Sequence, residues 1–136
     1  MHDSSSPTWP LLDDDTRCPC LSGETYGSCC GPFHRGAAAP TAVRLMRSRY
    51  SAFVTGDAPY LLRTWHPTTR PGSLELDPGI RWFRLEILGS TGGGLLDTVG
   101  TVEFSARYRA DGSAAEQHEN SRFVRHDGAW VYVDAI

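Results

Sequence analysis

All four cysteines of the chain lie between positions 18 and 30, as Cys18, Cys20, Cys29 and Cys30. Two closely spaced pairs that face each other across a glycine-containing loop can surround one metal ion, and four thiolates in a tetrahedron are ligands of structural Zn²⁺ sites. The segment 17–40 has too little apolar surface for its own core, so a bound ion would also supply folding energy. We expect structural zinc here, with no open position for catalysis.

Other interpretations of the cysteines stay open at this point. Disulfides form in oxidising compartments, and the N-terminus lacks the basic region and apolar stretch of an export signal. A redox pair is more typically spaced Cys-x-x-Cys, and a zinc or redox sensor would need labile thiols. His34 is an alternative ligand in place of Cys30. No apolar run approaches the roughly 18 residues of a membrane span, so we expect a cytoplasmic protein.

Composition divides the chain into three parts and excludes several reaction classes. Residues 1–16 are rich in Ser, Pro and Asp and are expected to form a flexible leader, residues 17–40 form the zinc-binding motif, and residues 41–136 form an α+β domain. The 13 basic residues are all arginine. Without lysine, the chain has no Schiff-base lysine, lysine general base or phosphate-loop lysine.

The first part of the α+β domain has helical periodicity. Thr41 is suited to cap a helix that ends at Gly56, and its apolar stripe consists of Val43, Met46, Tyr50 and Phe53. Asp57 can cap a shorter helix over 58–64, and Pro67 ends it. Tyr60, Leu61 and Trp65 are expected to face inward.

The rest of the chain alternates as β-strands do. The predicted strands cover residues 80–89, 96–109, 113–125 and 129–135. Asp111-Gly112 and Asp127-Gly128 separate the last three, and Asp-Gly is a strong signal for a two-residue hairpin turn. Two helices followed by a meander predict an α+β domain in which the helices cover one face of an antiparallel sheet.

The two turns also predict which residues face each other. The first pairs Phe104 with Glu119 and Ser105 with His118, while the second pairs Ser121 with Asp134. Polar groups on the aromatic face are candidates for a ligand site, and a β-bulge would bring His118 inward. The structural alternative to a ligand site is that Glu119 accepts hydrogen bonds from backbone N–H groups or forms an ion pair with an arginine. The candidate pocket residues are Glu119, Ser121, Asp134, His118, His66, Tyr60 and Trp65.

Several segments resemble a known family. CPCLSGETYGSCCGPFH is similar to the SEC-C motif, and three further segments resemble the YchJ-like family of small bacterial proteins: RLMRSRYSAFVTGDAPYLLRTWHP, GTVEFSARYR and HENSRFVRHDGAWVYVDA. The resemblance covers residues 17–135 and implies a domain like nuclear transport factor 2, a curved sheet with helices packed over its concave face. It also implies that the four cysteines are metal ligands. The family has no settled biochemical activity. Leu21 stands where the motif usually has glycine.

Charge is unevenly distributed along the chain. The formal net charge is −3, yet residues 16–55 contain five arginines against Glu24 alone. Arg35, Arg44, Arg47 and Arg49 are therefore candidates for a surface that meets a protein or ribonucleoprotein partner, the alternative being a solvated helix face. We expect a non-enzymatic adaptor. The alternative is a proton-transfer enzyme or small-molecule binder that uses the concave pocket, and dimerisation stays open.

Overall fold

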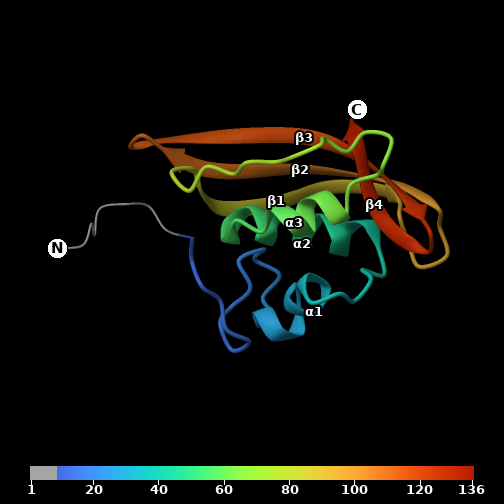
Figure 1. The fold of residues 1–136 in the computed structure, drawn as a ribbon, viewed down its shortest axis with the longest axis horizontal. Helices are drawn as coiled ribbons and strands as arrows, with labels where there is room; N and C mark the ends of the chain where they lie inside the picture. The colour runs from blue at the N-terminus through green and yellow to red at the C-terminus, as the bar shows by residue number, and fades with distance from the viewer. Residues whose placement is uncertain (1–8) are drawn as a thin grey trace.

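One antiparallel sheet with the strand order β1-β2-β3-β4 forms a layer, and helices cover one of its faces (Figure 1). The computed structural model describes residues 9–136. Its strands are β1 (Arg81–Gly92), β2 (Val99–Ala110), β3 (Ser113–His126) and β4 (Ala129–Ala135). Its helices are the 3₁₀ helix η1 (Tyr26–Ser28), α1 (Gly31–His34), α2 (Ala42–Thr55) and α3 (Ala58–Arg63). The predicted α+β architecture, an antiparallel sheet with helices on one face, is confirmed.

The two main helices begin and end as their sequences predict. Thr41 Oγ1 accepts a hydrogen bond from the Arg44 backbone N–H at 3.2 Å, which caps α2. Gly56 ends α2 with a φ of 74°, a left-handed conformation that costs glycine little. Asp57 Oδ1 accepts from the Tyr60 N–H at 3.1 Å and caps α3. Local capping chemistry therefore sets these boundaries.

Helix α2 is buried on two opposite sides, which the apolar stripe alone does not predict. Met46, Tyr50 and Phe53 face the sheet, while Ser51 contacts the cysteine segment. Figure 1 shows α2 between the strands on one side and α1 with the N-terminal segment on the other. Because both sides are covered, the polar residues of this helix need partners inside the protein.

Arg49 is one of those buried polar residues, so its prediction as a surface residue is wrong. Its side chain is 4% exposed, and Nη1 donates to Leu61 O at 2.8 Å and to Thr64 Oγ1 at 2.7 Å. The guanidinium also lies over the rings of Trp65 and Tyr132, at 5.3 and 4.8 Å from their centroids. Burial lowers the pKa of Arg49 to about 10, so the group stays charged at neutral pH.

The predicted β2–β3 register is confirmed along its whole length. Asp111 and Gly112 both have positive φ, 53° and 78°, and the strands pair Phe104 with Glu119 and Ser105 with His118. No register shift occurs between these two strands. His118 therefore stays on the polar face of the sheet, and the bulge that would have turned it inward is not formed.

The predicted β3–β4 register is correct only next to the turn. Phe123 pairs with Tyr132, but a shift between Arg122 and Phe123 then pairs Arg122 with Asp134. The predicted pairing of Ser121 with Asp134 is wrong, because Ser121 pairs with Ala135. On the edge of β4 that does not pair with β3, the backbone of Tyr132 makes two more hydrogen bonds. The Tyr132 N–H donates to Thr64 O at 2.8 Å, and Tyr132 O accepts from the His66 N–H at 2.7 Å. The bulge bends β4 so that it keeps its hydrogen bonds to β3 as well as those to Thr64 and His66.

The β1–β2 connection lies three residues later than predicted, because β1 continues to Gly92 and β2 begins only at Val99. Asp97 Oδ2 accepts from the Gly94 N–H at 2.9 Å and closes the turn between them. No helix among the described residues is long and apolar enough to cross a membrane.

The environment of Arg49 predicts a difference between two arginines of the same helix. Arg49→Lys keeps the charge but loses the stacked guanidinium, so it should lower the free energy of unfolding by about 1–2 kcal/mol. Arg44→Lys, at an exposed position of α2, should change it by at most about 0.5 kcal/mol. Urea unfolding of the two variants measures both values, and equal effects would contradict the buried role of Arg49.

Candidate functional site

The four cysteine sulfurs form one buried cluster. Their Sγ atoms all lie within 4.8 Å of one another. Cys20 Sγ is 3.6 Å from Cys29 Sγ, and Cys29 Sγ is 3.9 Å from Cys30 Sγ. All four are free thiols, since these separations exceed the roughly 2.05 Å of a disulfide bond. The structure thus brings together the residues that the sequence predicts as metal ligands.

A tight chain reversal presents the first cysteine pair. The Cys18 N–H donates to Glu24 O at 2.9 Å, and the Leu21 N–H donates to Cys18 O at 3.2 Å. Leu21 has a φ of 65°, the left-handed conformation that favours glycine, which explains why a motif of this kind prefers glycine there. The turn forms with leucine in its place. Cys29 and Cys30 follow η1, and Cys30 caps α1.

The spacing of the sulfurs fits a Zn²⁺ ion. A regular tetrahedron with Zn–S bonds of about 2.3 Å has S···S edges of about 3.8 Å, close to the separations measured here. Burial raises the pKa of the Cys29 thiol to about 11, and hydrogen bonds from Cys18 and Cys30 lower that of Cys20. Four thiolates this close repel one another, so a divalent cation would supply the charge that lets all four ionise.

Polar groups from outside the motif hold the cluster in place. Ser51 Oγ donates to Cys30 Sγ at 3.3 Å and lies 3.7 Å from Cys18 Sγ, so α2 itself contacts the sulfurs. Ser22 Oγ is 3.2 Å from Cys29 Sγ, and Arg47 Nη1 donates to Cys20 O at 2.8 Å. Groups in such positions orient metal ligands. Ser51 was not predicted as part of this site, although a small polar residue within a helix is a signal of close packing.

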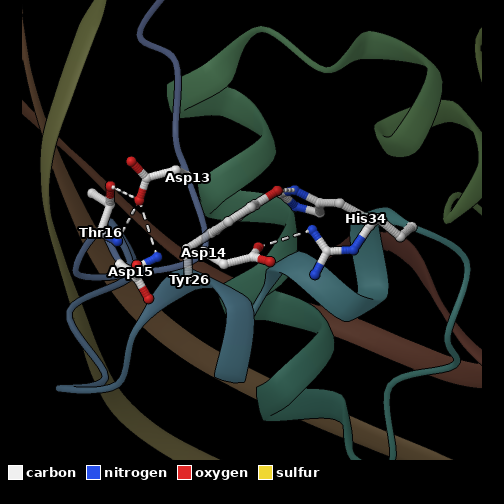
Figure 2. A network of polar contacts seen from close by, with 7 residues as sticks. Asp13, Asp14, Asp15, Thr16, Tyr26 and His34 are labelled. Carbon is white, nitrogen blue, oxygen red and sulfur yellow. Dashed lines mark hydrogen bonds and ion pairs between the residues drawn. The ribbon is translucent and has the colours of Figure 1, made fainter.

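His34 is not part of the cluster, so its interpretation as a ligand in place of Cys30 is wrong. Its Nε2 donates to Ser48 O at 2.8 Å, and its Nδ1 accepts from the Tyr26 hydroxyl at 2.6 Å. Figure 2 shows the Tyr26 hydroxyl pointing at this ring. Burial lowers the pKa of His34, which keeps the ring neutral. The residue therefore joins the cysteine segment to α2.

The end of the predicted flexible leader is bound to the cysteine segment. Asp13 Oδ1 accepts from Thr16 Oγ1 at 2.9 Å and from the Asp15 N–H at 3.0 Å, forming the turn that Figure 2 shows. Asp14 Oδ1 pairs with Arg35 Nη1 at 3.2 Å. Residues 13–16 therefore have defined hydrogen-bond partners, and the flexible leader stays a prediction, most of which, residues 1–8, lies outside the described residues.

Glu119 and Ser121 lie together on the helix-covered face of the sheet. Glu119 Oε2 accepts from Ser121 Oγ at 2.5 Å and from the Tyr132 hydroxyl at 3.2 Å, and Oε1 accepts from Gln117 Nε2 at 3.3 Å. Burial and the neighbouring Glu119 carboxylate raise the pKa of Tyr132 to about 12. Among the described residues, these side-chain donors take the place of the backbone donors or arginine that the structural alternative expected for Glu119.

Two other pocket candidates have partners on the opposite face. Asp134 Oδ1 pairs with Arg122 Nε at 3.1 Å, and His118 Nε2 lies 2.6 Å from Glu103 Oε2. The prediction of Asp134 on the aromatic face followed from the wrong register and fails with it. His118 and Asp134 therefore do not converge with Glu119.

The remaining pocket candidates lie around the end of α3. Tyr60 is buried, with its hydroxyl 2.7 Å from Ser48 Oγ, and the Trp65 ring packs edge-on against Tyr132. The His66 ring lies 4.8 Å from that of His126, tilted by 59°, and its Nδ1 accepts from the Thr68 N–H at 3.1 Å. Tyr60 and Trp65 are thus packing residues of this region, and His66 organises the following turn.

The arginines predicted as a partner surface differ in exposure. Arg35 and Arg44 are exposed, and the Arg44 guanidinium lies 5.3 Å from the centre of the Phe33 ring. Arg47 is half-buried at the cysteine segment, and Arg49 lies in the core. Two of the four therefore lie fully on the surface.

Comparisons with known proteins match both parts of the chain. Residues 41–135 match the model described as the YchJ middle NTF2-like domain, and residues 16–32 match the SEC-C motif. A UPF0225 protein of Streptomyces coelicolor is 64% identical over 118 residues, which are 86% of this chain and 92% of that protein. A UPF0225 protein of Corynebacterium glutamicum is 55% identical over 117 residues, 85% of this chain and 93% of the relative.

Two solved structures share the fold. The solution structure of a SEC-C motif containing protein from Rhodopseudomonas palustris has a TM-score of 0.75 at 35% identity, covering 88% of this chain and 96% of that one. The crystal structure of a SEC-C motif containing protein from Psychrobacter arcticus has a TM-score of 0.72 at 28% identity, covering 89% and 82%. The union of cysteine motif and sheet domain is therefore shared with experimentally solved proteins.

The two carboxylates that were predicted to share a face should differ in their contribution to stability. Glu119→Ala leaves the hydroxyls of Ser121 and Tyr132 without their acceptor and should lower the free energy of unfolding by about 1–3 kcal/mol. Asp134→Ala removes an exposed ion pair and should change it by less than about 0.5 kcal/mol. Chemical denaturation measures both. A larger effect at Asp134 would contradict the observed register.

Proposed function

The chain belongs to the YchJ family, in which a SEC-C motif precedes an NTF2-like domain, and from this premise we propose that it is a zinc-stabilised adaptor. Cys18, Cys20, Cys29 and Cys30 hold one structural Zn²⁺ ion. The cysteine segment and the adjoining arginines contact an acidic surface of a protein or ribonucleoprotein, and the sheet domain supports them. The four free thiols suit a reducing compartment, so we place this function in the cytoplasm.

The closed sulfur cluster carries the zinc part of the proposal. Its four sulfurs all lie within 4.8 Å of one another, two of the separations, 3.6 and 3.9 Å, match a zinc tetrahedron, and four thiolates leave no ligand position to a substrate. The ion would neutralise the thiolates and join the chain at Cys18 and Cys20 to the chain at Cys29 and Cys30. Its chemistry here is that of a cross-link, and catalysis by the metal is not part of the proposal.

Metal analysis tests this site directly. The purified protein should contain about one equivalent of zinc by elemental analysis, because four thiolates complete one tetrahedron. Cys20→Ser and Cys29→Ser should each lower the zinc affinity by at least about tenfold. Ser28→Ala, a change beside the motif cysteines, should leave the zinc content intact. Zinc retained at full affinity in both cysteine variants would refute the four-ligand site.

The surface beside the cluster supports the partner part of the proposal. Arg35, Arg44 and Arg63 are exposed around α1, and Arg63 Nη2 donates to the carbonyls of Phe33 and His34 at 3.2 Å each. Within residues 9–136, Asp14 is the only carboxylate paired with any of these guanidinium groups. The net positive charge left on this side attracts an acidic macromolecular surface.

Charge reversal tests the partner surface. Arg35→Glu/Arg44→Glu should abolish capture of the partner from the native cytoplasm, because it turns attraction into repulsion. Arg81→Glu/Arg109→Glu, the same charge change on exposed residues of the sheet, should leave capture unchanged. Loss of capture after nuclease treatment identifies a ribonucleoprotein, and persistence identifies a protein. Equal capture by all variants would contradict this surface.

The proton-transfer alternative has less support from the geometry. It requires Glu119, His118, Ser121 and Asp134 to meet in one pocket, whereas His118 and Asp134 bind partners on the opposite face of the sheet. Glu119 is itself occupied by hydroxyl donors. An adaptor therefore accounts better for the arrangement of these residues.

A further inference from the structure

An open cavity lies where the first described residues of the chain meet the end of α2 and the beginning of β1. It has a volume of about 180 Å³. Three aromatic side chains line it, Trp9, Phe53 and Trp82, together with the acidic residues Glu75 and Asp77. The remaining lining residues are apolar, and none belongs to the cysteine cluster or to the arginine surface beside it.

The three rings come from separate segments and are held by close packing. Gly56, which ends α2, has no side chain, and a Cβ atom built there would come within 2.4 Å of two atoms of the Trp9 ring. Trp9 therefore packs directly on the backbone at Gly56. Phe53, three residues earlier on α2, packs against Trp82 of β1 with 6.0 Å between ring centroids. The N-terminal segment, α2 and β1 thus each place one ring at the same space.

Arginines of this chain stack on other aromatic rings but not on these three. Arg125, for example, lies 4.7 Å from the centre of the Trp130 ring. Within residues 9–136, no guanidinium group lies over Trp9, Phe53 or Trp82. The face of an aromatic ring is electronegative and attracts cations. The ring surfaces at the cavity therefore suit a cation that the chain itself does not supply.

Two carboxylates add negative charge to the cavity. Glu75 and Asp77 are exposed, and within the described residues neither forms an ion pair. Asp77 Oδ1 accepts from the Gly79 N–H at 2.8 Å, which holds this carboxylate at the turn before β1. The nearby Arg81 lines a separate cavity of about 60 Å³. The lining is therefore acidic and contains no basic residue among those described, so its charge is complementary to a cation.

The combination of rings and carboxylates defines the kind of cation. A primary ammonium ion is strongly hydrated and has three N–H donors to satisfy, which walls made of ring faces do not do. A quaternary ammonium group has no N–H, and aromatic cages recognise it through cation–π attraction. A cavity of about 150 Å³ holds benzene, so this space has room for a trimethylammonium group, which has fewer heavy atoms.

We propose that this cavity binds a small organic cation that carries a quaternary ammonium group, as choline does. The methyl groups of the cation lie against Trp9, Phe53 and Trp82, and the exposed carboxylates of Glu75 and Asp77 attract its charge. Trp9 completes the cage, which gives the N-terminal segment a role in binding. The site goes beyond the proposed adaptor function and is independent of it, because the two share no residue.

Choline and 3,3-dimethyl-1-butanol are matched probes, because a carbon atom replaces the charged nitrogen in a molecule of the same shape. In titrations of the full-length protein followed by ¹H–¹⁵N NMR, choline should saturably shift the indole N–H signals of Trp9 and Trp82, and not that of the buried Trp130. The uncharged alcohol should bind at least about fivefold more weakly, since it lacks the cation–π attraction. Absence of saturable shifts at Trp9 and Trp82, or equal affinities for the two probes, would overturn the proposal.

Removal of one ring is the second arm of the experiment. Trp9→Leu keeps an apolar side chain but loses the ring, so it should weaken choline binding at least about fivefold. Phe83→Leu is the same kind of change at a ring of β1 that is 43% exposed and does not line the cavity, and it should leave the affinity unchanged. Unchanged choline affinity in Trp9→Leu would refute the cage.

Neutralising the two carboxylates is the third arm, and it keeps all three rings. Glu75→Gln/Asp77→Asn should weaken choline binding about threefold and leave that of 3,3-dimethyl-1-butanol unchanged, because only choline is charged. Glu24→Gln/Glu86→Gln, the same charge change at exposed positions outside the cavity, should affect neither probe. This arm decides even if Trp9→Leu loosens the N-terminal segment, and an equal effect on both probes would contradict recognition of the charge.

Discussion

The burial of α2 on two opposite sides is the constraint on which the rest of the structure depends. Because the sheet covers one side and the cysteine segment the other, every polar side chain between them must be satisfied internally. Ser48 bonds to Tyr60, Arg49 to the end of α3, and Ser51 to the cysteine sulfurs. Each of these bonds fixes another element relative to the helix. The short α1 and α3 thereby acquire defined positions that their own apolar surfaces could not determine.

Local rules predicted the parts of the fold that depend on neighbouring residues. Capping by Thr41 and the hairpin at Asp111-Gly112 are set within a few residues, and both are confirmed. The bulge after Arg122 depends instead on bonds between Tyr132 and the distant segment 64–66. A contact between distant segments leaves no signal in the alternation of apolar and polar residues along β4. The register was therefore predictable up to the point where a third segment joins the sheet.

The same distinction applies to the candidate site. The spacing of four cysteines within one short segment was enough to predict that they converge, since thiols so placed need only one turn between the pairs. The surroundings were not predictable, because they come from α2. Apolar periodicity detects one helix face, and Arg49 looked like a surface residue because its charge interrupts that stripe. A charged residue can occupy a second buried face when it stacks between rings, here those of Trp65 and Tyr132.

Helix α2 also explains how the cysteine segment and the sheet hold one another in place. Arg47 and Ser51, one helical turn apart, face the cysteine segment, whereas Met46, Tyr50 and Phe53 face the sheet. Arg47 bonds to Cys20 O and Ser51 to Cys30 Sγ, so both cysteine pairs are tied directly to the helix. Because packed interiors transmit small displacements, a shift of the cysteine segment is passed through α2 to the sheet. The two parts of the chain differ in chemistry but share one positioning element.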